Sequence, residues 1–75
     1  MCNVRIDLYK TGSKISELRK RNKVTVKKLQ DELGFNTPQA IYKWQRGECL
    51  PAVDNLVILA HIFGVSVDDI LVIEK

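Results

Sequence analysis

The sequence predicts an all-α fold, in which a compact bundle of five short helices forms one domain. Apolar residues recur at helical spacing in short sets that are separated by glycines, and no segment sustains the alternation of a β-strand. The 75 residues contain no repeat, low-complexity tract or linker, and a chain of about this length supports a single small core. We therefore expect one domain over residues 1–75, with its core at about 8–72 and a short N-terminal arm at 1–7.

The first helix is expected over residues 8–22. Leu8, Ile15 and Leu18 fall on one stripe, and Asp7 is placed to cap the helix. Basic residues gather near its C-terminal end, where the helix dipole favours cations. Gly12 weakens the start of this helix, because glycine is a poor helix former.

A second helix is expected over residues 26–33, and its signals are local. Thr25 is a good N-cap, and Gly34 suits the left-handed position that ends a helix. The apolar residues that share its inward face are Val26, Leu29 and Leu33.

The third helix follows almost at once, after Gly-Phe-Asn. Thr37 is the expected cap, Pro38 takes the first helical position, where its missing N–H costs nothing, and Gly47 ends the helix. Phe35 supplies an apolar plug in the connection. Two short helices joined so tightly must cross steeply, as in a helix-turn-helix.

The last two helices are expected at about residues 53–63 and directly after Ser66. The fourth follows Ala52, which is a poor capping residue, and ends at Gly64. The fifth begins at Ser66, and Asp69 three residues later completes the pattern of a capping box. The inward residues of the fourth helix are Leu56, Leu59, Ala60 and Phe63.

The third helix divides into two faces. Ile41 and Trp44 point inward together, which favours a core anchor over base stacking for the tryptophan. Glutamine can bond adenine at two points, lysine can donate to guanine, and an arginine at the end of the helix suits a phosphate. The outward side of this helix could also be the solvated face of an ordinary helix. The outward residues, at helical spacing on one stripe, are Gln39, Tyr42, Lys43 and Arg46.

The net charge of +3 is divided unevenly along the chain. Residues up to Arg46 carry eleven of the twelve Lys and Arg against four acids, whereas the remainder carries one lysine against five acids. No acid lies within residues 33–47. This division favours one surface built for a polyanion, although a solvated lysine-rich surface would show the same counts.

A resemblance to a known family rests on two runs, ISELRKRNKVTVKKLQDELGFN and IYKWQRGECLPAVDNLVILAHIFGVSVDDIL. Over roughly residues 12–72, the chain resembles the Cro/repressor-type helix-turn-helix domains, also called the xenobiotic-response-element (XRE) family. The resemblance implies a five-helix, lambda-repressor-like bundle that regulates transcription in a bacterial or phage setting, in the cytoplasm at the nucleoid. It also implies a homodimer that binds double-stranded DNA at a palindromic operator.

We expect two groups of DNA contacts, most of them implied by the resemblance. Lys27 could equally be a solubilising charge, and Tyr42 could have a partly exposed packing role. The base contacts are Pro38, Gln39, Tyr42 and Lys43. The phosphate contacts are Thr25, Lys27, Asn36 and Arg46.

Three departures from the family pattern bear on this site. Arg19 of the first helix would pair with an acid of the third, which here is Gln45, so a hydrogen bond replaces the salt bridge. Val26 stands where the family often has a glutamine that touches DNA. The segment 34–41 is one residue longer than the commonest spacing, and we expect the extra residue in the turn around 36–37.

Nothing in the sequence indicates an enzyme, a cofactor or a small-molecule effector. Cys2 and Cys49 form no CxxC pair and His61 is the only histidine, so a tetrahedral metal site lacks ligands. We expect two reduced thiols, with Cys49 as a small filler in its loop, and a solvent-facing His61. The most apolar run, LVILAHIFGVSV, is too short to span a membrane, which indicates a cytoplasmic protein.

An alternative function is a protein-interaction module on the same fold, such as an antitoxin-like or adaptor domain. The acidic and apolar C-terminal part of the chain favours it. Val72 and Ile73 in this part either fold back on the core or contribute to the seam of a homodimer.

Overall fold

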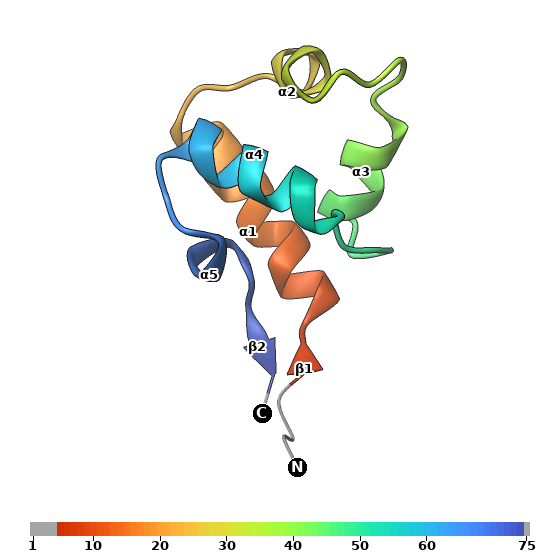
Figure 1. The fold of residues 1–75 in the computed structure, drawn as a ribbon. Helices are drawn as coiled ribbons and strands as arrows, with labels where there is room; N and C mark the ends of the chain where they lie inside the picture. The colour runs from red at the N-terminus through yellow and green to blue at the C-terminus, as the bar shows by residue number, and fades with distance from the viewer. Residues whose placement is uncertain (1–4, 75) are drawn as a thin grey trace.

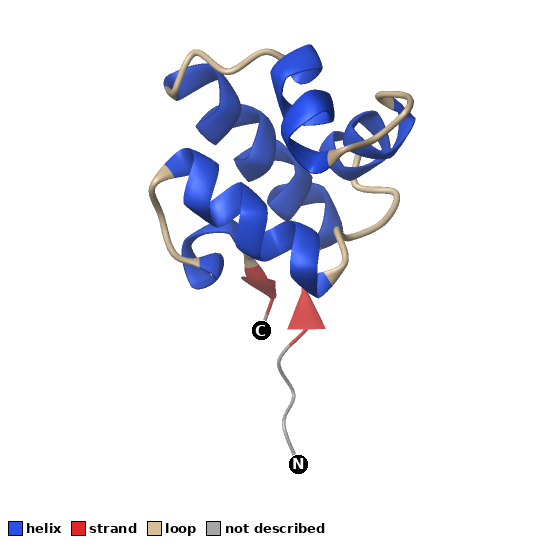
Figure 2. Cartoon of the chain, turned by 45° about the horizontal axis from the view of Figure 1, so that its top comes forward, coloured by secondary structure: helices blue, strands red, loops and turns tan. Residues whose placement is uncertain are grey.

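A computed structural model describes residues 5–74, and within them five helices and one short antiparallel ribbon are present (Figure 1). Helices account for nearly all of the body, and the ribbon lies at one end of it (Figure 2). The fold class is as predicted, with the ribbon as an addition. The elements in order are β1 (Arg5–Ile6), α1 (Leu8–Arg21), α2 (Val26–Leu33), α3 (Gln39–Gln45), α4 (Val53–Phe63), α5 (Val67–Ile70) and β2 (Ile73–Glu74).

Most helix ends follow the local chemistry that the sequence predicts. The Asp7 carboxylate accepts from the amide three residues on at 2.8 Å, and the Thr25 hydroxyl does the same at 3.0 Å. Ser66 begins α5 with a complete capping box. Gly34 and Gly64 end α2 and α4 in the left-handed conformation, with φ of 73° and 69°. These five helix boundaries are therefore set largely by adjacent residues.

The core forms where the inward faces of the helices meet. The expected inward sets of α2, α3 and α4 all lie in or against it, which confirms the helical spacing. Leu8 is the exception, because it lies in the first turn of α1, outside the buried cluster, and is 40 % exposed. The buried cluster is Ile15, Leu18, Leu29, Ile41, Trp44, Leu56, Leu59, Ala60, Phe63 and Ile70.

Gly12 lies where α1 crosses α3. A Cβ atom at this position would lie 2.2 Å from the carbonyl oxygen of Trp44 and 2.9 Å from that of Gln45. The two backbones can approach this closely only because residue 12 has no side chain. A residue that looks like a weak helix start in the sequence thus fixes the position of α3 against α1.

The ribbon joins the two ends of the chain and was not predicted. Strand β1 pairs with β2 in antiparallel register, and the Asp7 amide donates to the Val72 carbonyl at 2.8 Å. The buried Thr11 hydroxyl accepts from the Val72 amide at 3.0 Å. The C-terminal segment therefore folds back on α1 through its backbone, while the Ile73 side chain stays 54 % exposed. The expected arm is thus paired at residues 5–6, and its residues 1–4 lie outside the described part.

Candidate nucleic-acid interface

Helices α2 and α3 form a compact unit at one side of the bundle. Figure 1 shows α2 nearly end-on and α3 along its length, so the two helices cross steeply, as predicted. Phe35 fills the angle between them, with its ring against Trp44 in an edge-on arrangement at a centroid distance of 5.8 Å. The Gln30 side-chain amide donates to the Phe35 carbonyl at 3.3 Å. The apolar plug expected at Phe35 is confirmed, and it holds α3 at a fixed angle.

The start of α3 differs from the prediction by one residue. Thr37 does not cap the helix; Pro38 occupies the N-cap position, and no side-chain hydrogen bond caps this end. The reason is that the chain bends through residues 36–38, so the first helical bond runs from the Tyr42 amide to the Pro38 carbonyl, at 3.2 Å. Gln39 becomes the first helical residue. Asn36 and Thr37 are exposed on the outside of this turn.

The outward stripe of α3 forms one surface. Its four members, which we call the reading face, line a single shallow hollow, and Tyr42 is 43 % exposed. Ile41 and Trp44, on the opposite side of the helix, are 0 % and 4 % exposed. The helix therefore anchors one side in the core and leaves the other exposed to solvent. The reading face consists of Gln39, Tyr42, Lys43 and Arg46.

The exposed face of α2 carries two ion pairs. Lys27 Nζ lies 3.2 Å from Asp31 Oδ1, and Lys28 Nζ lies 2.9 Å from Glu32 Oε1. The hydrogen bond to Glu32 raises the pKa of Lys28 above its ordinary value of 10.5. Exposed pairs of this kind contribute little to stability because water and salt screen them, so either lysine can exchange its carboxylate for a phosphate. Thr25, at the start of α2, is exposed and still has its hydroxyl hydrogen to donate.

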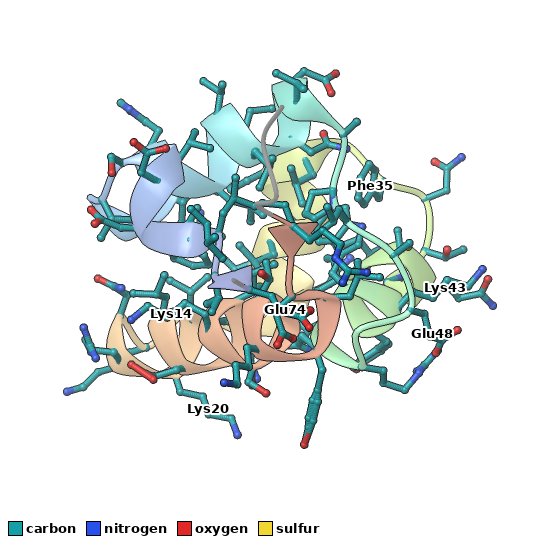
Figure 3. The ribbon with its side chains drawn as sticks, turned by 90° about the horizontal axis from the view of Figure 1, so that it is seen from below. Lys14, Lys20, Phe35, Lys43, Glu48 and Glu74 are labelled. Atoms are coloured by element: carbon teal, nitrogen blue, oxygen red, sulfur yellow. The ribbon has the colours of Figure 1, made fainter. Side chains whose placement is uncertain are left out.

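An acidic residue also lies at the end of the reading face, and the sequence did not predict it there. Gly47 adopts a φ of 78°, which turns the chain back, and the Glu48 amide donates to the Lys43 carbonyl at 2.9 Å. The Glu48 carboxylate forms an ion pair with Nε of Arg46. Figure 3 shows Lys43 and Glu48 on the same side of the molecule. The left-handed glycine in WQRGE is the signal that could have placed this acid over the last turn of α3.

Arg19 of α1 supports α3 from behind. Its Nε donates to Gln45 Oε1 at 3.0 Å, and its Nη1 donates to the Val24 carbonyl at 2.9 Å. The expected replacement of a salt bridge by a hydrogen bond is confirmed. One partly buried guanidinium thus ties α1 to both α3 and the segment that leads into α2.

The remaining single residues have no place in this surface. His61 is exposed, as expected. Cys49 is an exposed thiol rather than a small filler, because its loop buries Pro51 instead; Cys2 lies outside the described residues. Within residues 5–74 there is no group of three or more side chains that could hold a metal ion. No helix in that range is long and apolar enough to cross a bilayer.

Comparison with known proteins places the fold. A family model described as helix-turn-helix matches residues 15–70. Similar crystal structures include the restriction-modification controller protein C.AhdI from Aeromonas hydrophila, with a TM-score of 0.74 at 22 % identity over 85 % of this chain and 96 % of that one. The DNA-binding domain of BldD gives a TM-score of 0.71 at 19 % identity, covering 88 % and 94 %. The clp gene regulator ClgR from C. glutamicum gives 0.68 at 23 %, covering 80 % and 77 %. No curated protein sequence matches the chain.

Proposed function

This chain belongs to the helix-turn-helix family, whose Cro/repressor-type members are non-enzymatic, DNA-binding transcription regulators, and on that premise we propose that it recognises a specific sequence of double-stranded DNA. The observation that carries the proposal is the reading face, in which four side chains that suit DNA are exposed together on a helix anchored by Ile41 and Trp44. In the proposed complex, α3 lies in the major groove.

Two members of the reading face have the chemistry to read bases. Lys43 can donate to O6 and N7 of guanine, and Gln39 can bond N6 and N7 of adenine. Tyr42 offers a hydroxyl group and a flat apolar surface beside them. Pro38 precedes them at the N-cap of α3, where its ring would touch a base edge by apolar contact only. Lys43 lies on the last turn of α3 and Gln39 on the first, so the two would read neighbouring base pairs.

The phosphate contacts would fix the register of α3 in the groove. Thr25 and Lys27 at the start of α2 would bind one phosphate group of the DNA backbone. The Thr25 hydroxyl can donate to it, and the Lys27 ammonium can leave Asp31 to meet it. Asn36 in the turn and Arg46 at the end of α3 would bind phosphate groups on either side of it. Such contacts carry no sequence information of their own but orient the residues that do.

We also propose that the chain acts as a homodimer on a palindromic operator. Two recognition helices on one face of the duplex must lie about one helical turn apart, which two copies related by two-fold symmetry achieve. Exposed apolar side chains support a second copy: Ile73 in β2 is 54 % exposed, and Val53 and Val57 on α4 are 78 % and 55 % exposed. Analytical ultracentrifugation of Ile73→Glu and of Val57→Lys would show which surface holds the dimer, since only the variant at that surface should sediment as a monomer. A wild type that sediments as a monomer would refute the proposed homodimer.

Competition for DNA tests the function. A labelled duplex selected from a random pool should stay bound in the presence of excess random duplex. The logarithm of its affinity should fall linearly with the logarithm of the salt concentration, with a slope of roughly −2 per chain if Lys27 and Arg46 each neutralise one phosphate. A chain that binds no duplex in this assay would act through a protein partner instead.

A further inference from the structure

The turn after α3 holds Glu48 in a fixed place. Gly47 needs its φ of 78° to reverse the chain, and a Cβ there would lie 2.8 Å from the Tyr9 Cα, so the turn packs directly on the backbone of α1. The Gly47 amide donates to the Trp44 carbonyl at 3.0 Å, and the Glu48 amide donates to the Lys43 carbonyl at 2.9 Å. These contacts therefore hold the backbone at residue 48 in a fixed position relative to α3.

From that position the Glu48 side chain reaches the reading face. Its Oε2 accepts from Arg46 Nε, and this contact leaves both terminal amino groups of the guanidinium for another ligand. A guanidinium held in this way presents a planar pair of donors, which matches the oxygens of a phosphate. The contact thus favours one orientation of the arginine before DNA arrives.

We propose that Glu48 is a positioning residue for Arg46 and thereby a determinant of sequence specificity; this inference rests on the proposed DNA-binding function. A positioned Arg46 meets its phosphate only in the register that brings Lys43 and Gln39 to their base edges. A loose Arg46 binds phosphates in any register, because phosphates repeat along every duplex. Positioning therefore favours the cognate site over random DNA.

The negative charge of Glu48 has a separate and opposite effect, which the experiment must remove. A carboxylate beside DNA weakens binding to every duplex alike, because all duplexes carry the same phosphate charge. The ratio of cognate to random affinity cancels this effect, whereas it retains the effect of positioning. Glu48→Gln and Glu48→Ala remove the same charge, but only glutamine keeps an oxygen that can accept from Arg46 Nε.

The test is the ratio of affinities for a selected duplex and a random duplex, measured for the wild type and both variants by fluorescence anisotropy. Because both partners are exposed, at 59 % and 49 %, the pair has the strength of a surface ion pair. Glu48→Ala should therefore lower the ratio about two- to fivefold. Glu48→Gln should recover most of that loss. Equal ratios for the two variants would overturn the proposal.

A second readout needs no DNA. In the free protein the Nε–Hε proton of Arg46 should exchange with water more slowly in the wild type and in Glu48→Gln than in Glu48→Ala. Equal exchange rates in the wild type and in Glu48→Ala would refute the positioning contact itself. Slower exchange in the wild type than in Glu48→Ala, together with a wild type that prefers no DNA sequence, would instead refute the proposed function, so the two failures are distinguishable.

Discussion

Replacing Gly12 with alanine should loosen the crossing of α1 and α3. The new Cβ would lie 2.2 Å from the Trp44 carbonyl oxygen, whereas ordinary contacts begin near 3.4 Å, so the helices must separate by more than 1 Å. Overpacking of this kind costs about 1–3 kcal/mol, and alanine recovers about 0.5–1 kcal/mol through its better helix propensity. Because both obstructing atoms belong to backbone that cannot rotate aside, we expect a net loss of about 2 kcal/mol of unfolding free energy.

Urea unfolding followed by circular dichroism measures this loss as a lower midpoint at an unchanged slope. A loss of 2 kcal/mol would lower the melting temperature by roughly 8–16 °C in a domain of this size. Ser13→Ala is the matched control, since residue 13 is exposed on the same helix and the substitution should be neutral or slightly stabilising. If Gly12→Ala were as stable as this control, α1 and α3 could not approach as closely as described.

Three further substitutions test other contacts. Thr11→Val removes the buried acceptor of the Val72 amide and should cost about 1–3 kcal/mol of unfolding free energy, measured by urea unfolding. Thr11→Ser keeps the hydroxyl and should cost less. Equal losses would show that the hydrogen bond contributes nothing. Gln45→Glu gives Arg19 a charged acceptor in place of the amide at 3.0 Å and should raise the unfolding free energy by about 0.5–1 kcal/mol; a less stable variant would contradict this contact. The hydrogen bonds from the backbone and then the hydroxyl of Ser66 hold the pKa of Asp69 below its ordinary value of 3.8. The folded state thus gains stability from the ionised Asp69 above pH 3.8, and this gain is lost as the pH falls through the lower folded value. The stability advantage of the wild type over Asp69→Asn should therefore vanish in that acidic range, and an advantage that persisted there would refute the capping interaction.

The features that the sequence predicts well depend on neighbouring residues. The caps at Asp7, Thr25 and Ser66 and the left-handed stop at Gly34 each involve residues no more than a few positions apart, so their residue types alone indicate the structure. The division of α3 into buried and exposed faces was predictable for the same reason. The helical spacing of its apolar and polar residues, and its anchor Trp44, can be seen within a stretch of seven residues.

The features that the sequence did not predict depend on distant parts of the chain. The ribbon pairs Arg5 with Glu74, and strands of two residues are too short to show any alternation. The role of Gly12 appears only when α3 is placed beside it. Thr37 has the right residue type for a cap, but the bend through residues 36–38 moves the helix start to Gln39. For the ribbon and for Gly12, tertiary geometry decides among conformations that the local sequence allows.

The reading face itself is an intermediate case. The sequence placed its four side chains on one stripe, and the structure brings them around one hollow. The partners of the cations were missed, because the pairs formed by Lys27 and Arg46 depend on side-chain rotamers and on the turn at Gly47. The assignment of individual base and phosphate contacts therefore stays a prediction.

Selection of bound duplexes from a random pool tests most directly whether α3 reads DNA sequence. The wild type should enrich a half-site repeated with two-fold symmetry. Lys43→Ala should weaken binding to that site by about 1–3 kcal/mol and relax the preference at one position of each half-site, whereas Arg46→Ala should weaken binding without changing the preferred base at any position. Lys20→Ala is the matched control, since Lys20 is an exposed lysine on α1, far from Lys43 in Figure 3. An unchanged preference for Lys43→Ala, or no enriched sequence with the wild type, would contradict the assignment of α3 as the reading helix.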